Sequence, residues 1–331
     1  MKNICVKINP IIKNGEDIIM NSYPLKLKSV LKDYLWAGTR ISSEFGKSEN
    51  PNEKIAESWE LTVHKNGVNI IENGEYAGKT LEDLFNLDKS IISPDYKSDR
   101  FPVLIKYIDA GQDLSVQVHP DDDYAYRVEN ESGKTEMWYI IDAKPDSELI
   151  YGLNGDYTRE QLQNLINENR FGECLNYVKV KPGEVYFIPA GLVHAIGEGI
   201  LIAEIQQNSD TTYRFYDYNR LGADGKLREL HIEKALDVCI KTKSSTKNIK
   251  SKTSCEYFDV KKITGVDFIL DSIKSFVSVV CIDGKGGIIC GEKTYEIKKG
   301  DSYFIPAGIK NCEIKKINKD FTFLLTTLGN A

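Results

Sequence analysis

Two of the four histidines of this chain lie where predicted strands end, beside other groups that can bind a metal. In the segment Ser115-Val-Gln-Val-His119, polar and apolar residues alternate, so Ser115, Gln117 and His119 point to one face of a strand. Glu136 opens a following strand, and His194 follows a Pro-Ala-Gly turn. Burying such groups without partners costs about 1–3 kcal/mol each. The pattern therefore predicts a site rather than a core.

Two imidazoles, one carboxylate and one amide oxygen can hold a metal ion and still leave a position open, as catalytic metal sites do. The same pair of histidines with one carboxylate is also the ligand set of non-haem iron oxygenases. Gln117 as an additional ligand argues against that alternative, because oxygen activation needs open positions. His64 and His231 have no comparable setting, and we expect both at the surface or in hydrogen bonds.

Strands must position these residues, because short stretches rich in Val, Ile, Tyr and Phe recur between Gly, Pro, Asp and Asn. The predicted strands are Phe101–Ile108, Ser115–Val118, Met137–Ile141, Val185–Ile188, Ile200–Ile205, Phe276–Ile282 and Phe321–Thr326. Helices are predicted after Thr80, after Thr158, where Gln161 completes a capping box, and at Glu229–Ile240. The chain is therefore predicted to be mainly β and mostly antiparallel, with a few helical insertions.

An internal repeat divides the chain. KPGEVYFIPAGLVH, residues 181–194, returns as KKGDSYFIPAGIKN, residues 298–311, with Asn311 in place of His194. The polar, Lys- and Ser-rich stretch 241–254 is the best linker between the copies. We therefore predict a metal-binding β domain with helical insertions at 1–240 and a related β domain without metal ligands at 255–331.

Composition narrows the partners and the compartment. The 331 residues carry a net charge of -6 and show no basic stripe for nucleic acid, no apolar run long enough for a membrane helix and no signal peptide, so we expect a cytoplasmic protein. The seven cysteines are odd in number and form no C-x-x-C pair. We therefore expect reduced thiols rather than disulfides or a cysteine-based zinc site.

Several motifs together resemble a known family. GQDLSVQVH (111–119) and GEVYFIPAGLVH (183–194) resemble the two cupin motifs, and AESWE (56–60), FPVLIKYIDAGQDLSVQVHPDDDYA (101–125), GKTEMWYII (133–141) and SDTTYRFYDYNR (209–220) resemble type I mannose-6-phosphate isomerases of the short bacterial form. The resemblance implies two cupin-like jelly-roll domains. It also implies one Zn²⁺ per chain, held by Gln117, His119, Glu136 and His194.

The implied reaction interconverts mannose 6-phosphate and fructose 6-phosphate by an enediolate-type proton transfer between C1 and C2. The resemblance places Arg214 in the active site and Lys134, Glu57, Ser115 and Lys106 around the pocket. Arg214 and the metal would stabilise the enediolate. Two candidates for the base stay open: Lys134, which would first have to lose its proton, and Glu57. Ser115, with Lys106 or Arg214, would bind the phosphate.

Two rival functions remain at this point. Cupins also host iron oxygenases, and some bind sugars without catalysis. The full ligand set and the presence of Arg214 and Lys134 favour the isomerase over both. An unphosphorylated aldose stays open as a substrate. We expect a sugar phosphate as the partner and a monomer or a weak homodimer.

Overall fold

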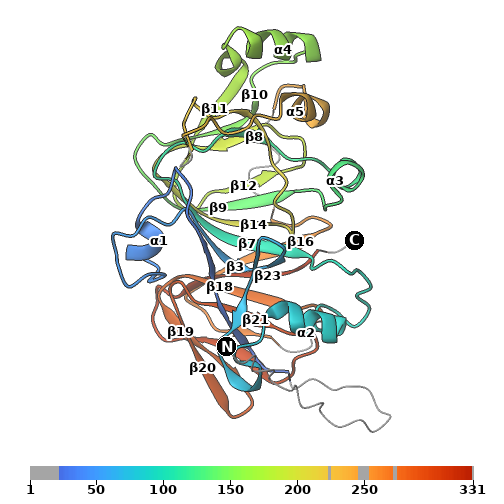
Figure 1. Ribbon diagram of the computed structural model, residues 1–331. Coiled ribbons are helices and arrows are strands. Elements are labelled where there is room, and N and C mark those ends of the chain that lie inside the picture. The colour runs from blue at the N-terminus through green and yellow to red at the C-terminus, as the bar shows by residue number, and fades with distance from the viewer. Residues whose placement is uncertain (1–21, 223–224, 245–252, 271–273, 330–331) are drawn as a thin grey trace, which may run out of the picture.

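A computed structural model describes residues 22–222, 225–244, 253–270 and 274–329, and Figure 1 shows their larger sheets stacked as layers. The first two layers form the N-terminal β-sandwich. Its inner sheet has the order β12 (Val185–Ile188), β9 (Glu136–Ala143), β14 (Ile200–Gln207), β7 (Val103–Asp109), β3 (Glu57–Leu61) and β2 (Val30–Lys32). Its outer sheet has the order β11 (Leu175–Lys179), β10 (Glu148–Leu153), β13 (His194–Ile196), β8 (Val116–Val118) and β15 (Tyr213–Tyr216).

The other two layers are built mainly by the C-terminal half, with two strands from the N-terminal part of the chain. One sheet has the order β16 (Phe258–Thr264), β23 (Thr322–Leu328), β18 (Val277–Asp283), β21 (Ser302–Ile305), β1 (Leu25–Lys28) and β6 (Ile70–Ile71). The last sheet has the order β17 (Phe268–Ile269), β22 (Cys312–Lys316), β19 (Lys285–Cys290) and β20 (Lys293–Lys298). A small hairpin joins β4 (Val63–His64) to β5 (Gly67–Val68). The prediction of a mainly β, two-part cupin fold is confirmed.

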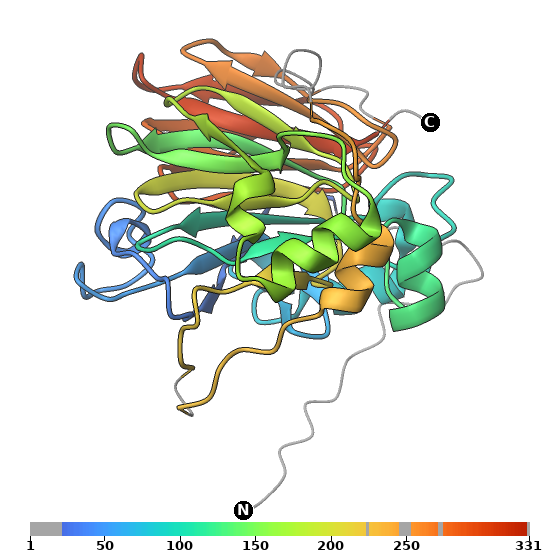
Figure 2. The same cartoon turned by 90° about the horizontal axis from the view of Figure 1, so that it is seen from above.

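Helices are short and lie around the sheets. They are α1 (Arg40–Ser43), α2 (Leu81–Leu87), α3 (Asp122–Glu129), α4 (Arg159–Asn167) and α5 (Ile232–Val238), with 3₁₀ turns η1 (Gly74–Tyr76), η2 (Lys89–Ile91) and η3 (Phe171–Cys174). Leu162 of α4 and Leu236 of α5 pack with Val118 on the open face of the outer sheet. Figure 2 shows these two helices side by side, beside α3. The capping box of Thr158 and Gln161 is confirmed at the start of α4.

The inner sheet is buried on both faces. Trp138 and Ile202 point toward the outer sheet and pack with Tyr151. On the other face, Tyr107 and Leu201 belong to one core with C-terminal residues that include Phe276 and Phe304. The C-terminal half thus packs against the N-terminal sandwich and covers one face of its inner sheet. The inner sheet is held from both sides, which suits a scaffold that must fix charged groups.

The repeat seen in the sequence returns in three dimensions. β12 and β21 occupy the same place in the two copies, and both are preceded by a glycine with positive φ, Gly183 (φ 88) and Gly300 (φ 90). A second glycine follows each strand at the Pro-Ala-Gly turn, Gly191 (φ 85) and Gly308 (φ 75). Only glycine adopts this backbone readily, so the turn chemistry repeats with the strand.

The domain limits stay a prediction. Much of the expected linker, residues 245–252, lies outside the described residues. The strand β1, from the start of the predicted 1–240 domain, pairs with β21 of the C-terminal half. The first described strand therefore belongs to a sheet of the second domain, although it precedes the first domain in the sequence.

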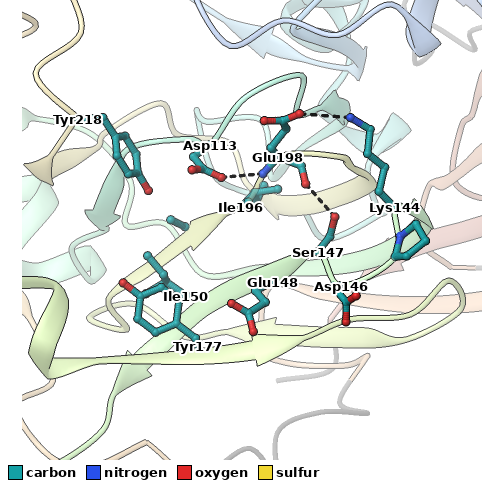
Figure 3. A pocket seen from close by; sticks show the side chains of 13 residues that line it. Asp113, Lys144, Asp146, Ser147, Glu148, Ile150, Tyr177, Ile196, Glu198 and Tyr218 are labelled. Carbon is teal, nitrogen blue, oxygen red and sulfur yellow. Dashed lines mark hydrogen bonds and ion pairs between the residues drawn. The ribbon is translucent and has the colours of Figure 1, made fainter.

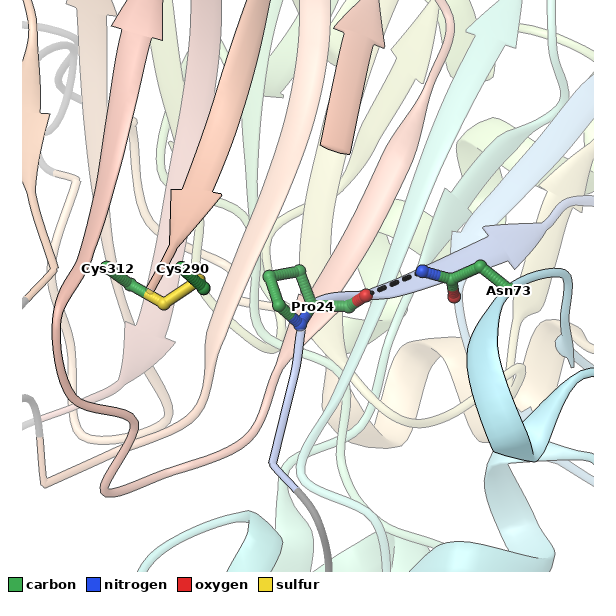
Figure 4. The surroundings of a disulfide bond; sticks show 4 residues. All are labelled: Pro24, Asn73, Cys290 and Cys312. Atoms are coloured by element: carbon green, nitrogen blue, oxygen red, sulfur yellow. Dashed lines mark hydrogen bonds between the residues drawn. A yellow bond between two sulfur atoms is a disulfide. The ribbon is translucent and has the colours of Figure 1, made fainter. Parts of the chain in front are cut away.

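One expectation about the cysteines was wrong. Cys290 on β19 lies directly opposite Cys312 on β22, and their sulfurs are joined in a disulfide (Figure 4). Counting cysteines and searching for C-x-x-C pairs misses such a bond, because the sheet register brings together residues 22 apart in the sequence. Cys174, Cys239 and Cys281 are buried thiols, as expected, whereas Cys5 lies outside the described residues.

Candidate metal centre and active site

The two sheets of the N-terminal sandwich bring the predicted metal ligands together from separate strands. Glu136 begins β9 of the inner sheet, and His119 directly follows β8 of the outer sheet. His194 begins β13 and pairs with Gln117 on β8. Gln117 pairs in turn with Arg214 on β15. Strand register alone therefore sets three of the predicted site residues side by side.

His119, Glu136 and His194 form a compact buried cluster. One ligand atom from each lies within 4.8 Å of the others. Glu136 Oε2 is 3.6 Å from His119 Nε2, and Glu136 Oε1 is 3.5 Å from His194 Nε2. The relative exposure of all three residues is at most 1%. A donor set of two imidazoles and one carboxylate suits Zn²⁺ and leaves room for further ligands.

The backbone orients both imidazoles. His119 Nδ1 donates to the carbonyl of Thr211 (2.9 Å), and His194 Nδ1 donates to the carbonyl of Leu192 (2.8 Å). These bonds fix the tautomer in which Nε2 keeps its lone pair and faces the cluster. Burial lowers the pKa of His119 well below its ordinary value and that of His194 to about 4. Both rings are therefore neutral, as metal ligands must be.

Glu136 supplies the strongest sign that a cation belongs in the cluster. The side chain is fully buried, and its carboxylate is held by the Lys134 ammonium, which lies 2.8 Å from Oε2. Burial, and then repulsion from the nearby Glu204 carboxylate, raise the pKa of Glu136 to about 7. A buried carboxylate is costly unless positive charge compensates it, which Lys134 now supplies and a metal ion could supply as well. The residues present fit a divalent metal.

The side-chain nitrogen of Lys134 lies between Glu136 and His119. Its Nζ lies 2.8 Å from Glu136 Oε2 and 3.0 Å from His119 Nε2. The lysine thus stands where a cation shared by these two side chains would be held. Because a lysine side chain already contacts both Glu136 and His119, the arrangement of these two side chains is suited to a cation.

Gln117 reaches the cluster from the outer sheet. Its Oε1 accepts a hydrogen bond from Ser115 Oγ (3.2 Å), and its Nε2 lies 3.4 Å from His194 Nε2. A 180° turn of the amide exchanges these two atoms and directs the oxygen at the cluster. Ser115 can then accept from the amide nitrogen, so the serine supports either orientation.

A row of alternating charges crosses the inner sheet beside the cluster. Lys106 Nζ on β7 lies 3.5 Å from Glu57 Oε2 on β3 and 3.4 Å from Glu204 Oε1 on β14. Trp59 Nε1 donates to Glu57 Oε2 (2.6 Å), and Trp138 Nε1 donates to Glu204 Oε2 (2.8 Å). The row is buried, so its members hold one another in fixed positions.

These contacts shift the pKa values within the row. Burial opposes the charge of Lys106, but the Glu57 and Glu204 carboxylates outweigh it and raise the pKa of the lysine. Burial likewise acts to raise the pKa of Glu204, but the charges of Lys134 and Lys106 and the Trp138 hydrogen bond lower it overall. Lys106 and Glu204 are therefore both charged at neutral pH.

Sequence reasoning missed Glu204, Asp210 and Arg228, all of which line the same cleft. Glu204 had a visible signal, because it is the one charge in the apolar run ILIAEI. Such a charge inside a strand buried on both faces needs a partner or a function. Asp210 and Arg228 lie outside the strands, and no local pattern marks them.

The cleft above the cluster has a volume of about 130 Å³. Six of the nine predicted site residues line it: Glu57, Lys106, Ser115, Gln117, Lys134 and Arg214. The other three, His119, Glu136 and His194, lie at its buried end, since Lys134 and Gln117 contact both the cleft and the cluster. The structure thus brings all the predicted site residues into one region.

A larger hollow of about 400 Å³ lies on the other side of β13 (Figure 3). Its wall carries Asp113, Glu148, Glu198, Tyr177 and Tyr218, and Ile196 lines both it and the cleft. Glu198 closes part of it through an ion pair with Lys144 (3.2 Å). This hollow contains none of the clustered metal ligands, so the smaller cleft is the candidate active site.

The remaining histidines lie in hydrogen bonds, as expected. His64 is buried, and its Nδ1 accepts from the backbone N–H of Asn66 (3.2 Å). His231 Nδ1 accepts from the backbone N–H of Arg214 (3.3 Å) and so helps to hold that segment in place. Neither residue belongs to the candidate metal cluster.

A β-sandwich with a two-histidine, one-glutamate cluster between its sheets defines a cupin with a candidate metal centre. Family models match two parts of the chain: phosphomannose isomerase type I, catalytic domain, at residues 25–139, and mannose-6-phosphate isomerase, cupin domain, at residues 248–316. Mannose-6-phosphate isomerase ManA of Bacillus subtilis is 44% identical over 88% of this chain and 95% of its own length. The chain therefore belongs to the type I mannose-6-phosphate isomerase family, and it is an isomerase of that family.

Comparison with solved structures supports the same family assignment. The chain resembles the mannose 6-phosphate isomerase of Bacillus subtilis with a TM-score of 0.82 and 36% identity, over 92% of this chain and 99% of the other. It shares the fold of a zinc-bound mannose 6-phosphate isomerase with a TM-score of 0.73 and 16% identity, over 93% of this chain and all of the other (100%). Within the described residues, we find no helix long and apolar enough to cross a membrane.

Proposed function

We propose that this chain is a zinc-dependent isomerase that interconverts mannose 6-phosphate and fructose 6-phosphate by moving a proton between C1 and C2. The buried cluster of His119, Glu136 and His194 at the end of a cleft lined with charged groups carries this proposal. Family membership supports the substrate, because the relatives that cover the chain are named for that reaction.

The metal would be held by His119, Glu136 and His194, with the Gln117 amide oxygen as a further ligand, one Zn²⁺ per chain. When bound, Zn²⁺ acts as a Lewis acid that polarises the sugar carbonyl and makes the neighbouring C–H acidic. Zinc suits an isomerisation without net redox change, since it has no redox chemistry of its own. Three strands and one strand end fix the backbone of the ligand residues, but the Lys134 ammonium would have to leave its place between Glu136 and His119, and the Gln117 amide would have to turn.

The proton transfer needs a base within reach of C1 and C2. Of the two candidates from the sequence, Glu57 is tied by Trp59 Nε1 and by Lys106. Lys134 lines the cleft and reaches the ligand cluster. A neighbouring dication favours the neutral amine of a lysine, which is the form that accepts a proton. We therefore assign the transfer to Lys134 and give Glu57 the role of holding Lys106.

The other predicted residues would bind and orient the sugar. Ser115 Oγ and Lys106 Nζ line the cleft from opposite sheets and can donate to sugar oxygens. Arg214 lines the same cleft from β15, where its fixed charge can bind the anionic part of the substrate. Each donor is fixed by the strand that carries it, so little reorganisation accompanies the reaction.

The test is a coupled assay for fructose 6-phosphate formed from mannose 6-phosphate. Purified protein is assayed as isolated, after chelation, and after zinc is added back, with metal content measured at each stage. Activity that disappears with chelation and returns with about one zinc per chain supports the proposal. Fully loaded protein that does not turn over mannose 6-phosphate refutes it.

The base is tested separately with two zinc-loaded variants. Lys134→Met should lower kcat by at least ~100-fold, as expected when a general base is lost. Glu57→Gln should retain more activity, because the carboxamide can still accept from Trp59. If Glu57→Gln is the more damaged variant while both bind zinc equally, the assignment to Lys134 is wrong.

A further inference from the structure

Arg214 has an unusual place in the cleft. Its Nε is buried and has no hydrogen-bond partner. No ion pair with its guanidinium occurs among the described residues, although the Asp210 carboxylate lines the same cleft. Its backbone is held firmly, since its N–H donates to His231 and the His231 N–H donates back to the Arg214 carbonyl (2.9 Å). A half-buried guanidinium that is fixed and has no carboxylate partner among the described residues is well placed to bind an anion.

A second guanidinium lines the same cleft. Arg228 lies in the segment that leads from β15 to α5, and it is anchored by Asp217, whose oxygens are 3.3 Å and 3.4 Å from Arg228 Nη1. After burial, the charge of Arg228 is the main factor that lowers the pKa of Arg214. Two arginines whose charges repel each other share one cleft wall.

The acidic groups nearby do not neutralise this pair. Asp217 also binds Arg220, so one carboxylate serves two guanidiniums. Asp210 lines the cleft too, but it accepts a hydrogen bond from Asn66 (3.0 Å), and the Lys106 charge acts on it more strongly than any other. The attraction of Asp217 and of Asp210 for Arg214 is each weaker than the repulsion from Arg228. This end of the cleft carries excess positive charge.

The rest of the cleft lacks such an excess. Lys106 has two carboxylates within 3.5 Å, and Lys134 is paired with Glu136. A dianion placed beside Lys106 would lie next to Glu57 and Glu204 and be repelled by both. The phosphate of a sugar phosphate is therefore better accommodated away from the charge row.

We infer that Arg214 and Arg228 together bind the phosphate group of the substrate, and that Arg228 selects phosphorylated over unphosphorylated sugars. Guanidinium groups suit this task, because their planar donors bind phosphate oxygens in pairs. The inference rests on the proposed function for the identity of the substrate. Lys106 and Ser115 would then bind sugar hydroxyls rather than the phosphate. Arg228, which lies outside the strands, would take part in substrate binding.

Arg228→Gln tests the assignment against a matched control, Arg220→Gln. Both arginines bind Asp217, but only Arg228 lines the cleft, whereas Arg220 reaches the Asp113 carbonyl (2.6 Å). Arg228→Gln should raise KM for mannose 6-phosphate by about 10–100-fold, the range for losing a charged hydrogen bond, with a smaller change in kcat. Arg228→Lys should recover part of the loss. Arg220→Gln should stay within about threefold of wild type.

Inorganic phosphate is the second probe, and it does not depend on turnover. Its dissociation constant, from calorimetric titration of the zinc-loaded protein, should rise in Arg228→Gln by a factor similar to that in KM, and unphosphorylated mannose should show no such change. Equal phosphate affinity in wild type and Arg228→Gln, or equal losses in Arg228→Gln and Arg220→Gln, would overturn the inference. Wild-type protein that binds phosphate through Arg228 but does not isomerise the sugar would instead refute the proposed function.

Discussion

Replacing Lys106 with methionine tests whether the charge row is held together as the structure indicates. Methionine matches the length of the lysine stem and removes only the ammonium. The Glu57 and Glu204 carboxylates would then face each other across β7 without the cation that now separates them. Both are buried, so water can replace the ammonium only in part. We expect a protein that folds but is clearly less stable.

The size of the effect follows from the distances. At an effective dielectric constant of ~20, unit charges 3.5 Å apart attract by roughly 5 kcal/mol, and Lys106 makes two such contacts. The cost of burying the ammonium, several kcal/mol, offsets much of this gain. Removing one partner from a buried ion pair typically costs about 3–5 kcal/mol, which for a protein of this size lowers the thermal midpoint by roughly 6–20 °C.

The loss should depend on pH. In wild type the pKa of Glu204 is lowered, so its contribution is present above the ordinary value of 4.5 and is lost as the pH falls. Without Lys106 the carboxyl pKa rises, so the variant loses stability as the pH increases. The difference in midpoint between the two proteins should therefore widen from about pH 5 to about pH 7.5.

The assay is thermal unfolding of chelated wild type and Lys106→Met at both pH values. Lys144→Met is the control, because its ion pair with Glu198 is solvent-exposed and worth less than ~1 kcal/mol. Adding Glu204→Gln to Lys106→Met should restore part of the stability, since it removes one of the stranded charges. A midpoint within ~2 °C of wild type at pH 7.5, or a difference that narrows as the pH rises, would show that the row is not the buried electrostatic unit described here.

Three shorter predictions address other parts of the molecule. Glu136→Gln should weaken zinc binding by more than ~100-fold in competition with a chromogenic chelator, because even partners of metal ligands are worth ~10–100-fold; unchanged affinity would remove Glu136 from the metal site. Cys312→Ser should lower the free energy of unfolding by about 3 kcal/mol, since it opens the loop closed with Cys290, and equal midpoints with and without reductant would contradict this. Burial lowers the pKa of His64, so the stability it contributes is present above 6.5 and lost below it. His64→Gln should therefore flatten the fall in thermal midpoint toward about pH 5, and an unchanged slope would show that other groups cause it.

The fold could be predicted where the local pattern agrees with the tertiary environment. Val185–Ile188 is β12 to the residue, because a positive-φ glycine and a Pro-Ala-Gly turn bound it. The capping box marks the start of α4 for the same reason. By contrast, α3 was not predicted, since only Ala125 of its residues is buried and no apolar stripe appears. β1 was missed because its partner β21 lies far along the chain.

The site was predictable as far as motifs with strand periodicity extend. Gln117 and His119 follow from alternation along β8, and their approach to His194 follows from register. Arg228 has no such signal, because its place in the cleft depends on the path of an irregular segment and on Asp217. Cys290 and Cys312 likewise meet only through sheet register. Long-range contacts of this kind cannot be read from spacing along the chain.

The buried carboxylates of the inner sheet have two different roles, which are distinguished by the groups that bind them. Glu60 on β3 accepts a hydrogen bond from Ser302 of the C-terminal half, and Lys47 (2.8 Å) and Ser58 (2.5 Å) bind it from the N-terminal half. Protein side chains thus bind the Glu60 carboxylate from both halves, so Glu60 links the N-terminal sandwich to the C-terminal half. Glu136 and Glu204 are bound instead by two lysines that line the cleft, Lys134 (2.8 Å from Glu136 Oε2) and Lys106 (3.4 Å from Glu204 Oε1). Buried charges that a ligand can reach therefore lie on the cleft side of the sheet, which is where we place the chemistry.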